Sequence, residues 1–422
     1  MAVLTIRPPA GTAVPPHTPR PYPLEVVPSP RVRALAAALA GAAGPGAVEA
    51  FWVEAARRGT PLVEDDGGGG YVVTFLWRDP GAAAVVLHAN RLTDFRDLAQ
   101  SLMRRLPGTD VWHLSYRMPG TWRASYRIGP LAEPLPPAGP DTPPDRAAWR
   151  ALRAAARTDP LNRSPLRERP GGPALSVVAL PDAPAQPWLA RRPGVPRGTV
   201  TVHEVRGRVV RAYLPPGDGH RELPVVVLLD GEVWSGDGGL ASTMDNLVHG
   251  GRVPPSAVLA VDSGDVPTRT RDLGCDPGFA AFLAGDLLTW AGARWPLTRD
   301  PGRTVVAGQS LGGLTAAYTA LCAAERFGAA LCQSPSLWFP GGEAAEWLTG
   351  RYAAAPRLPV RWYLEVGARE WDLVAPVRRF RDVLSGRGYP LSYAEYDGGH
   401  DIACWRGGLA EGLIALLGRA RP

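Results

Sequence analysis

One serine lies in a pattern that favours nucleophilic chemistry. Ser310 is the centre of Gly308-Gln309-Ser310-Leu311-Gly312, which follows the apolar run Val305-Val306-Ala307. A Gly-x-Ser-x-Gly turn between a strand and a helix is the signature of a nucleophile elbow, because only glycine fits beside a serine raised out of so tight a turn. The pattern alone is a weak signal in a chain with 49 glycines. The strand before it and the small-residue helical pattern after it make the prediction specific.

A serine nucleophile needs a base, because its hydroxyl is almost wholly protonated at neutral pH. His400 is the only histidine that follows Ser310, and it lies in the glycine-rich segment Asp397–Asp401. Hydrolases with this kind of elbow place the serine, the acid and the histidine in that order along the chain. We therefore expect His400 to be the general base, in a loop after the last strand.

The acid that orients the histidine is expected just after the preceding strand, Val360–Val366. Glu370 fits this place best, and Asp372, two residues further on, stays open as an alternative. Asp401 is less suitable, because the neighbour of the base in the sequence usually points its side chain elsewhere.

The negative charge that develops on a substrate carbonyl needs two backbone N–H donors. One is expected from Leu311, directly after the nucleophile. The other is expected from the loop Asp230–Trp234, around Glu232.

The elements that must position these residues form an alternating pattern from Thr199 onward. A hairpin over Thr199–Leu214 comes first, and buried strands then alternate with helical stretches. Such a pattern predicts a mostly parallel sheet covered on both faces, with its active site at the carboxyl ends of the strands. The predicted strands are Val225–Leu229, Ala257–Val261, Thr304–Ala307, Ala329–Gln333, Val360–Val366 and Leu391–Tyr396, and the predicted helices span 278–293, 311–325, 373–387 and 404–419.

The N-terminal half has an all-β pattern instead. After an alanine-rich helical stretch within 32–58, short β-rich segments are separated by Gly, Pro and Asp turns, which predicts a small antiparallel sandwich. These segments are 71–77, 84–88, 110–116 and 122–127. We therefore divide the chain into a flexible N-terminal arm (1–45), a β-sandwich (46–135), a proline-rich linker or strap (136–198) and a catalytic α/β domain (199–422).

Composition argues against several classes of partner. The net charge is +6, but the 46 basic residues are all arginines and are scattered, so we expect no nucleic-acid partner. The seven dispersed histidines predict no metal site, and no pattern indicates a cofactor. Without an apolar run of about 20 residues, no membrane span is expected. Four cysteines with no CxxC spacing, and no apolar leader, indicate reduced thiols in a cytoplasmic protein.

Beyond single motifs, the sequence resembles the enterochelin (enterobactin) esterase family. The resemblance covers nearly everything except the N-terminal arm. In the catalytic region it is carried by Leu228–Trp234, Gly308–Leu314, Gln333–Pro340, Leu364–Glu370 and Asp397–Leu409. In the N-terminal half it is carried by Phe51-Trp52, Gly59–Val63, Val73–Asp79, Gly108–Trp112 and Asp159–Asn162.

The resemblance implies an Ig-like N-terminal sandwich followed by an α/β-hydrolase domain. It also implies hydrolysis of the seryl-ester (trilactone) bonds of ferric catecholate siderophores in the cytoplasm. Iron would be released by this cleavage and would be present only as part of the substrate. The family nucleophile, base and acid fall on Ser310, His400 and Glu370, in agreement with the assignment from the residues themselves.

Candidate substrate contacts also follow from the resemblance. The family places an arginine, here Arg269, on the loop after Ala257–Val261, where it would face the trianionic iron–catecholate centre. Trp234, Trp338 and Trp405 are candidate flat walls for catechol rings. The simpler alternatives are a surface charge for Arg269 and core packing for the tryptophans.

Two other functions stay open. The same scaffold could serve a carboxylesterase or acyltransferase that acts on a different ester. The chain could also bind a siderophore without catalysis, although the intact set of serine, histidine and glutamate argues against this. The sequence leaves open which siderophore is bound and what the oligomeric state is.

Overall fold

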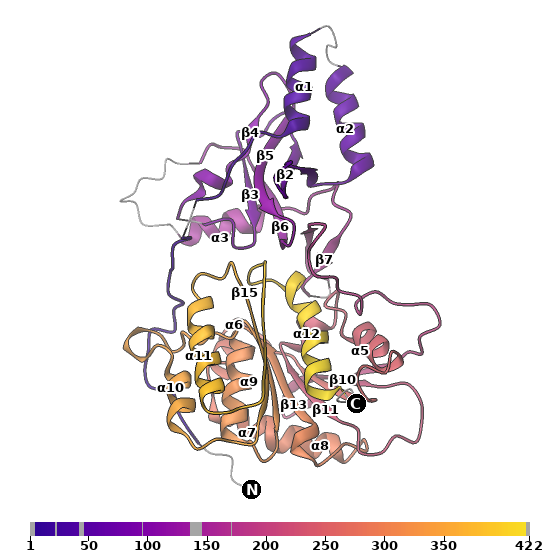
Figure 1. The fold of residues 1–422 in the computed structure, drawn as a ribbon, viewed down its shortest axis with the longest axis vertical. Helices are drawn as coiled ribbons and strands as arrows, with labels where there is room; N and C mark the ends of the chain where they lie inside the picture. The colour runs from indigo at the N-terminus through magenta and orange to yellow at the C-terminus, as the bar shows by residue number, and fades with distance from the viewer. Residues whose placement is uncertain are drawn as a thin grey trace.

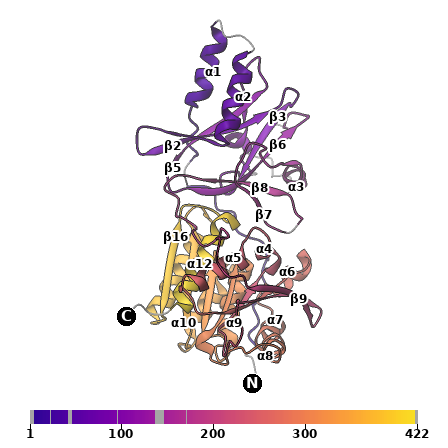
Figure 2. The same cartoon turned by 90° about the vertical axis from the view of Figure 1, so that its right-hand side faces the viewer.

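The computed structural model describes residues 5–21, 23–41, 46–94, 96–135, 146–169 and 171–418. It contains an N-terminal part, from α1 to β8, and a C-terminal part, from β9 to α12 (Figures 1 and 2). The N-terminal part is rich in antiparallel strands and the C-terminal part alternates strands with helices, so the predicted order of an all-β region and an α/β domain is confirmed.

The C-terminal part is built on one eight-stranded sheet with the strand order β16-β15-β14-β13-β11-β12-β10-β9. The six strands from β11 to β16 pair in parallel, and the hairpin β9–β10 adds an antiparallel edge. The strands are β9 Thr199–Val205, β10 Arg208–Leu214, β11 Val225–Leu229, β12 Ala257–Val261, β13 Thr304–Gln309, β14 Ala329–Gln333, β15 Arg361–Gly367 and β16 Leu391–Tyr396. The hairpin and all six predicted strands are present.

Helices cover both faces of this sheet (Figure 2). Two separate clusters of buried side chains place α7 to α11 on one face and α5 and α12 on the other. The predicted helix over 278–293 is interrupted by a π-helical turn at Leu283–Leu287. The helices are α4 Gly231–Trp234, α5 Leu240–His249, α6 Val266–Asp272, α7 Pro277–Phe282, α8 Leu288–Gly292, α9 Leu311–Cys322, α10 Trp347–Ala354, α11 Val374–Gly386 and α12 Ile402–Leu417.

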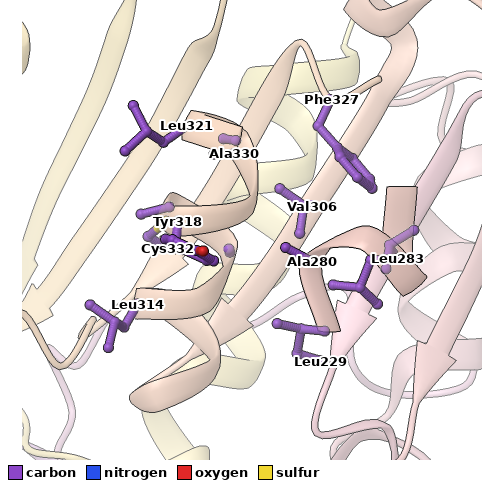
Figure 3. Close-up of a cluster of buried hydrophobic side chains, with 14 of the residues drawn as sticks. Leu229, Ala280, Leu283, Val306, Leu314, Tyr318, Leu321, Phe327, Ala330 and Cys332 are labelled. Carbon is purple, nitrogen blue, oxygen red and sulfur yellow. The ribbon is translucent and has the colours of Figure 1, made fainter. Parts of the chain in front are cut away.

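The apolar runs of the central strands follow from burial on both faces. Every residue of β11, β12, β13 and β14 is buried, which removes the alternation of a half-exposed strand. Figure 3 shows Leu314, Tyr318 and Leu321 of α9 beside Val306 and Ala330 of the sheet. The helix that follows Ser310 is therefore fixed against the strands of the sheet.

The N-terminal part consists of two four-stranded antiparallel sheets, β1-β2-β5-β4 and β3-β6-β8-β7. The sheets share one buried cluster, and the helices α1 and α2 pack with side chains of β1, β2 and β5 in another. The four predicted β segments are present as β2, β3, β5 and β6. The elements are α1 Pro30–Ala40, α2 Gly46–Arg58, β1 Leu62–Asp65, β2 Gly70–Arg78, β3 Ala84–Ala89, β4 Arg104–Arg105, β5 Val111–Pro119 and β6 Arg123–Leu131.

The proline-rich segment 136–198 is more than a linker. Within it, Arg146–Ala155 forms α3, while Pro165–Arg167 (β7) and Ala174–Ala179 (β8) complete the second sheet beside β6. β7 is an edge strand that begins with proline, a position where the missing N–H does no harm. The expectation that the sheets end at residue 135 is therefore wrong.

The N-terminal arm has defined contacts where the structure describes it. Its Ile6 carbonyl accepts a hydrogen bond from Tyr318 of α9, and its Ala13 N–H donates to the Pro340 carbonyl at 2.9 Å. The segment then runs along the C-terminal part and reaches β5 at Val26 (Figure 1). The described residues of the arm thus contact the rest of the chain at these points, and the flexibility of the arm stays a prediction.

The two parts share apolar packing at Leu166. This β7 side chain is fully buried in the same cluster as residues of α5 and α12. We expect Leu166→Ala to lower the free energy of unfolding by about 2–5 kcal/mol, the usual effect of a large-to-small change in a core. Urea unfolding followed by tryptophan fluorescence measures this. Val200→Ala, at a half-exposed position of β9, is the control; equal effects of the two changes would contradict the shared packing.

Candidate active site

Ser310 lies in a strained turn between β13 and α9. Its backbone has φ 58° and ψ −124°, a region that side-chain-bearing residues rarely occupy. The turn is so tight that a Cβ on Gly308 would lie 2.5 Å from the backbone of Gly312, so glycine is required there. The Ser310 N–H donates to the Gln333 carbonyl at 2.9 Å, which ties the turn to β14.

His400 lies between Ser310 and Glu370 in the loop between β16 and α12. Its Nε2 is 2.8 Å from the Ser310 Oγ, and its Nδ1 is 2.6 Å from Glu370 Oε2. An ionised carboxylate only accepts hydrogen bonds, so Nδ1 carries the proton and Nε2 is left to accept the serine proton. The imidazole edge also packs against Trp405, with ring centroids 4.7 Å apart.

Glu370 is fully buried just after β15. Burial alone would raise the pKa of its carboxyl, but the charge and hydrogen bond of His400, with help from Arg91 and Ser334, hold that pKa below its ordinary value. Its other oxygen, Oε1, accepts hydrogen bonds from the Ser334 hydroxyl at 2.5 Å and the Gly367 N–H at 2.8 Å. The carboxylate is thus ionised and fixed in orientation.

The other two acids considered from the sequence have different partners. Asp372 forms an ion pair with Arg91 at 2.6 Å. Asp401 caps α12 by accepting a hydrogen bond from the Ala403 N–H at 2.9 Å. Of the three, only Glu370 contacts the His400 ring.

The two residues whose backbone N–H groups are expected to bind the oxyanion lie shortly after the ends of strands. Leu311 is the first residue of α9, and Glu232 lies in the first turn of α4 after β11. N–H groups in the first turn of a helix have no acceptor within that helix, so they are suited to receive an anionic oxygen. The Glu232 side chain makes a separate contact, in which its carboxylate accepts a hydrogen bond from the Ser263 N–H at 3.0 Å.

The three tryptophans predicted to contact the substrate differ in their exposure and contacts. Trp234 has no exposed surface and donates to Gln309 at 3.2 Å, so its assignment as a substrate wall is wrong; it is a core residue. Trp338 and Trp405 each retain 7% exposure. Trp405 donates to the Ser334 hydroxyl at 3.0 Å, which places it beneath the acid and the base. Their contact with a substrate stays a prediction.

Arg269 is held by an internal partner. Its guanidinium makes two hydrogen bonds to the buried Asp230 carboxylate, at 2.6 and 2.8 Å. A paired arginine offers a ligand less charge than a free one. Its predicted role toward the substrate therefore lacks support from this geometry.

The N-terminal part also contributes to this site, although no sequence pattern indicates it. The Asn90 side-chain amide, just after β3, donates to the His400 carbonyl at 2.8 Å. Its neighbour Arg91 pairs with Asp372 and has a nitrogen 3.9 Å from Glu370. The backbone N–H of Ser125 in β6 donates to Asp401. These contacts join residues about 300 positions apart along the chain, so no local pattern could have revealed them.

A second buried carboxylate lies below the acid. Glu365 accepts hydrogen bonds from Gln333 at 2.6 Å and Tyr363 at 2.9 Å, but it forms no ion pair with any residue that the structure describes. Burial raises its pKa to about 7. It is therefore largely protonated in mildly acidic solution, unlike Glu370.

Within the part of the chain that the structure describes, no group of three or more His, Cys, Asp or Glu side chains is arranged to hold a metal ion. The same residues include no helix with the length and apolar character needed to cross a membrane. The four cysteines are buried and free.

Comparisons with known proteins agree with this geometry. Residues 72–189 match the family model of the enterochelin esterase N-terminal domain, and residues 205–416 match that of putative esterases. An iron(III) enterobactin esterase of Dickeya dadantii is 34% identical over 411 residues, covering 87% of this chain and 93% of the relative. An iron(III) salmochelin esterase of Escherichia coli O6:H1 is 34% identical with the same coverage. The crystal structure of the ferric enterobactin esterase of Salmonella typhimurium superimposes with a TM-score of 0.77 at 32% identity, covering 87% of this chain and 98% of that one.

The fold and these similarities define a carboxylic ester hydrolase with an esterase-type α/β domain. The chain belongs to the enterochelin (enterobactin) esterase family.

The hydrogen bond from Asn90 to the His400 carbonyl predicts an effect on turnover. We expect Asn90→Ala to lower kcat about tenfold, because a loop that loses one hydrogen bond of about 1–1.5 kcal/mol holds the imidazole less well. Hydrolysis of p-nitrophenyl acetate and the melting temperature, measured together, separate this effect from unfolding. Arg104→Ala, at an exposed site of β4, is the control. An unchanged kcat in Asn90→Ala would show that the contact does not position the base.

The raised pKa of Glu365 predicts a pH-dependent stability. A carboxyl whose pKa is higher in the folded than in the unfolded protein destabilises the fold as pH rises from about 4.5 toward 7. Glu365→Gln should remove this loss. Between pH 5 and pH 8 the free energy of unfolding should therefore fall by about 2–3 kcal/mol less in the variant than in the parent. Urea unfolding at both pH values tests it, with the exposed change Glu343→Gln as control. Parallel losses in parent and Glu365→Gln would contradict the assignment.

Proposed function

We propose that the protein is a serine esterase that hydrolyses the seryl-ester bonds of ferric catecholate siderophores of the enterobactin type. The observation that carries the catalytic part is the position of His400, whose two ring nitrogens lie 2.8 Å from the Ser310 Oγ and 2.6 Å from a Glu370 oxygen. Nucleophile, base and orienting acid are thereby in hydrogen-bond contact, as acyl transfer through a serine requires.

In the first step, His400 Nε2 takes the hydroxyl proton while the Ser310 Oγ bonds to the ester carbonyl carbon. The Glu370 carboxylate stabilises the imidazolium that forms. The carbonyl oxygen becomes an oxyanion that accepts hydrogen bonds from the Leu311 and Glu232 backbone N–H groups. The C–O bond to the leaving seryl oxygen then breaks, and this oxygen takes the proton from His400.

In the second step, water attacks the acyl-serine ester. His400 removes a proton from the water, a second oxyanion forms in the same place, and the Ser310 oxygen leaves with that proton. The enzyme returns to its starting state with one ester bond hydrolysed. No cofactor takes part in either step.

The proposed substrate rests on the relatives. Those that cover most of this chain are named for iron(III) enterobactin or iron(III) salmochelin. Crystal structures of a Shigella flexneri esterase, 31% identical, were determined in the presence of enterobactin and of 2,3-dihydroxy-N-benzoyl-serine. Opening the trilactone would separate the catecholates that together hold the iron, so iron release in the cytoplasm is the proposed consequence.

Ser310→Ala should abolish hydrolysis of ferric enterobactin, because no other group supplies the attacking oxygen. The matched control is Ser385→Ala, at an exposed serine of α11. Product analysis by mass spectrometry should find 2,3-dihydroxybenzoyl-serine and its linear oligomers with the parent and the control, and only the intact trilactone with Ser310→Ala.

Substrate class is tested with the parent enzyme on a panel of ferric enterobactin and p-nitrophenyl acyl esters. A higher kcat/KM for ferric enterobactin supports the proposal. A clear preference for the simple esters would favour a carboxylesterase of another specificity, and binding of ferric enterobactin without hydrolysis of any ester would favour a binding protein.

A further inference from the structure

A cavity of about 350 Å³ lies between the N-terminal part and the catalytic histidine. It is bordered by side chains that end β3, by β6, by α3 and by the His400 loop. The lining used in the argument is His88, Arg91, Arg127, Trp149, Arg153 and His400. Its size falls in the range of about 300–1,000 Å³ that is usual for small-molecule sites.

The cavity carries more positive than negative charge, because its described lining includes Arg91, Arg127 and Arg153 and a single carboxylate, Glu168. Neither Arg127 of β6 nor Arg153 of α3 has a carboxylate within 4.0 Å among the described residues. Burial lowers the pKa of Arg127; the attraction of Glu168 opposes this, and the smaller repulsion of Arg153 adds to it. Arg91 is occupied by Asp372. The half-buried Arg127 and the exposed Arg153 repel each other, and an anion placed between them would stabilise both beyond what Glu168 supplies.

An aromatic wall stands beside these arginines. The His88 and Trp149 rings lie 5.2 Å apart at an angle of 40°. Burial, together with Arg153 and Arg127, lowers the pKa of His88 to about 4, so that its ring is uncharged at neutral pH. The cavity therefore offers a flat apolar surface next to two cations.

We propose that this cavity binds one catecholate ring of the substrate while it is still coordinated to iron, with Arg127 and Arg153 facing its anionic oxygens. The inference rests on the proposed function and adds a selection between two forms of the substrate. Three iron-bound catecholates leave the ferric complex trianionic, whereas the catechols of the metal-free trilactone are mostly protonated and uncharged at neutral pH. The two arginines therefore favour the ferric form.

The position of the cavity fits the reaction. His400 belongs both to its lining and to the contact with the Ser310 Oγ. A ring held in the cavity brings the seryl ester attached to it toward the nucleophile. The N-terminal part would thus select the substrate while the C-terminal part cleaves it.

The test compares ferric and metal-free enterobactin as substrates of Arg127→Gln, Arg153→Gln and the parent. Each change should lower the ratio of kcat/KM for the ferric to the metal-free form about tenfold, the usual effect of losing one charge-assisted hydrogen bond. Arg157→Gln, at an exposed site just after α3 and outside the cavity, removes the same charge and should keep the parent ratio.

Binding is measured separately in a Ser310→Ala background, by quenching of tryptophan fluorescence on titration with ferric enterobactin. Adding Arg153→Gln should raise the Kd about tenfold and weaken its salt dependence. If Arg127→Gln and Arg153→Gln change the ferric to metal-free ratio of kcat/KM, and Arg153→Gln changes the Kd, no more than Arg157→Gln does, the inference is overturned while the proposed function stays intact. Absence of hydrolysis of both forms by the parent would instead overturn the proposed function.

Discussion

The strained turn at Ser310 is the constraint on which the rest of the structure depends. A non-glycine residue in such a backbone region costs about 1–3 kcal/mol and persists only where its surroundings hold it. Here the surroundings are the fully buried strand β13, the helix α9 packed against the sheet, and the hydrogen bond from Ser310 to β14. The parallel sheet with helices on both faces is the frame that keeps the nucleophile raised.

His400 is held from two sides. His400 lies in a glycine-containing loop, and its ring is fixed by Glu370 from the C-terminal part. The loop backbone is fixed from the N-terminal part by Asn90, and the neighbouring Asp401 accepts from Ser125. The N-terminal part is therefore part of the active-site architecture, and shared packing around Leu166 keeps it in place.

The sequence predicted features whose signals are local. The order of Ser310, Glu370 and His400, and the apolar runs of the parallel strands, are visible in short windows because chemistry and double-sided burial fix the residue types. β7 and β8 were missed because short edge strands flanked by proline and glycine resemble a linker. Trp234 was misjudged because burial depends on neighbours from distant segments. The role of Asn90 was missed for the same reason, since its partner His400 lies in a distant segment. The arginine cavity was missed because most of its lining comes from β3, β6 and α3, which are separated along the chain.

We propose that Ser310, activated by His400, cleaves the siderophore ester. This proposal is tested most directly by labelling the parent enzyme with a fluorophosphonate, locating the label by peptide mass spectrometry and assaying the labelled enzyme on ferric enterobactin. We expect one label per chain, on Ser310, with loss of hydrolysis in proportion to labelling and protection by ferric enterobactin. Full hydrolysis by enzyme labelled at Ser310, or loss of activity with the label on another residue, would contradict it.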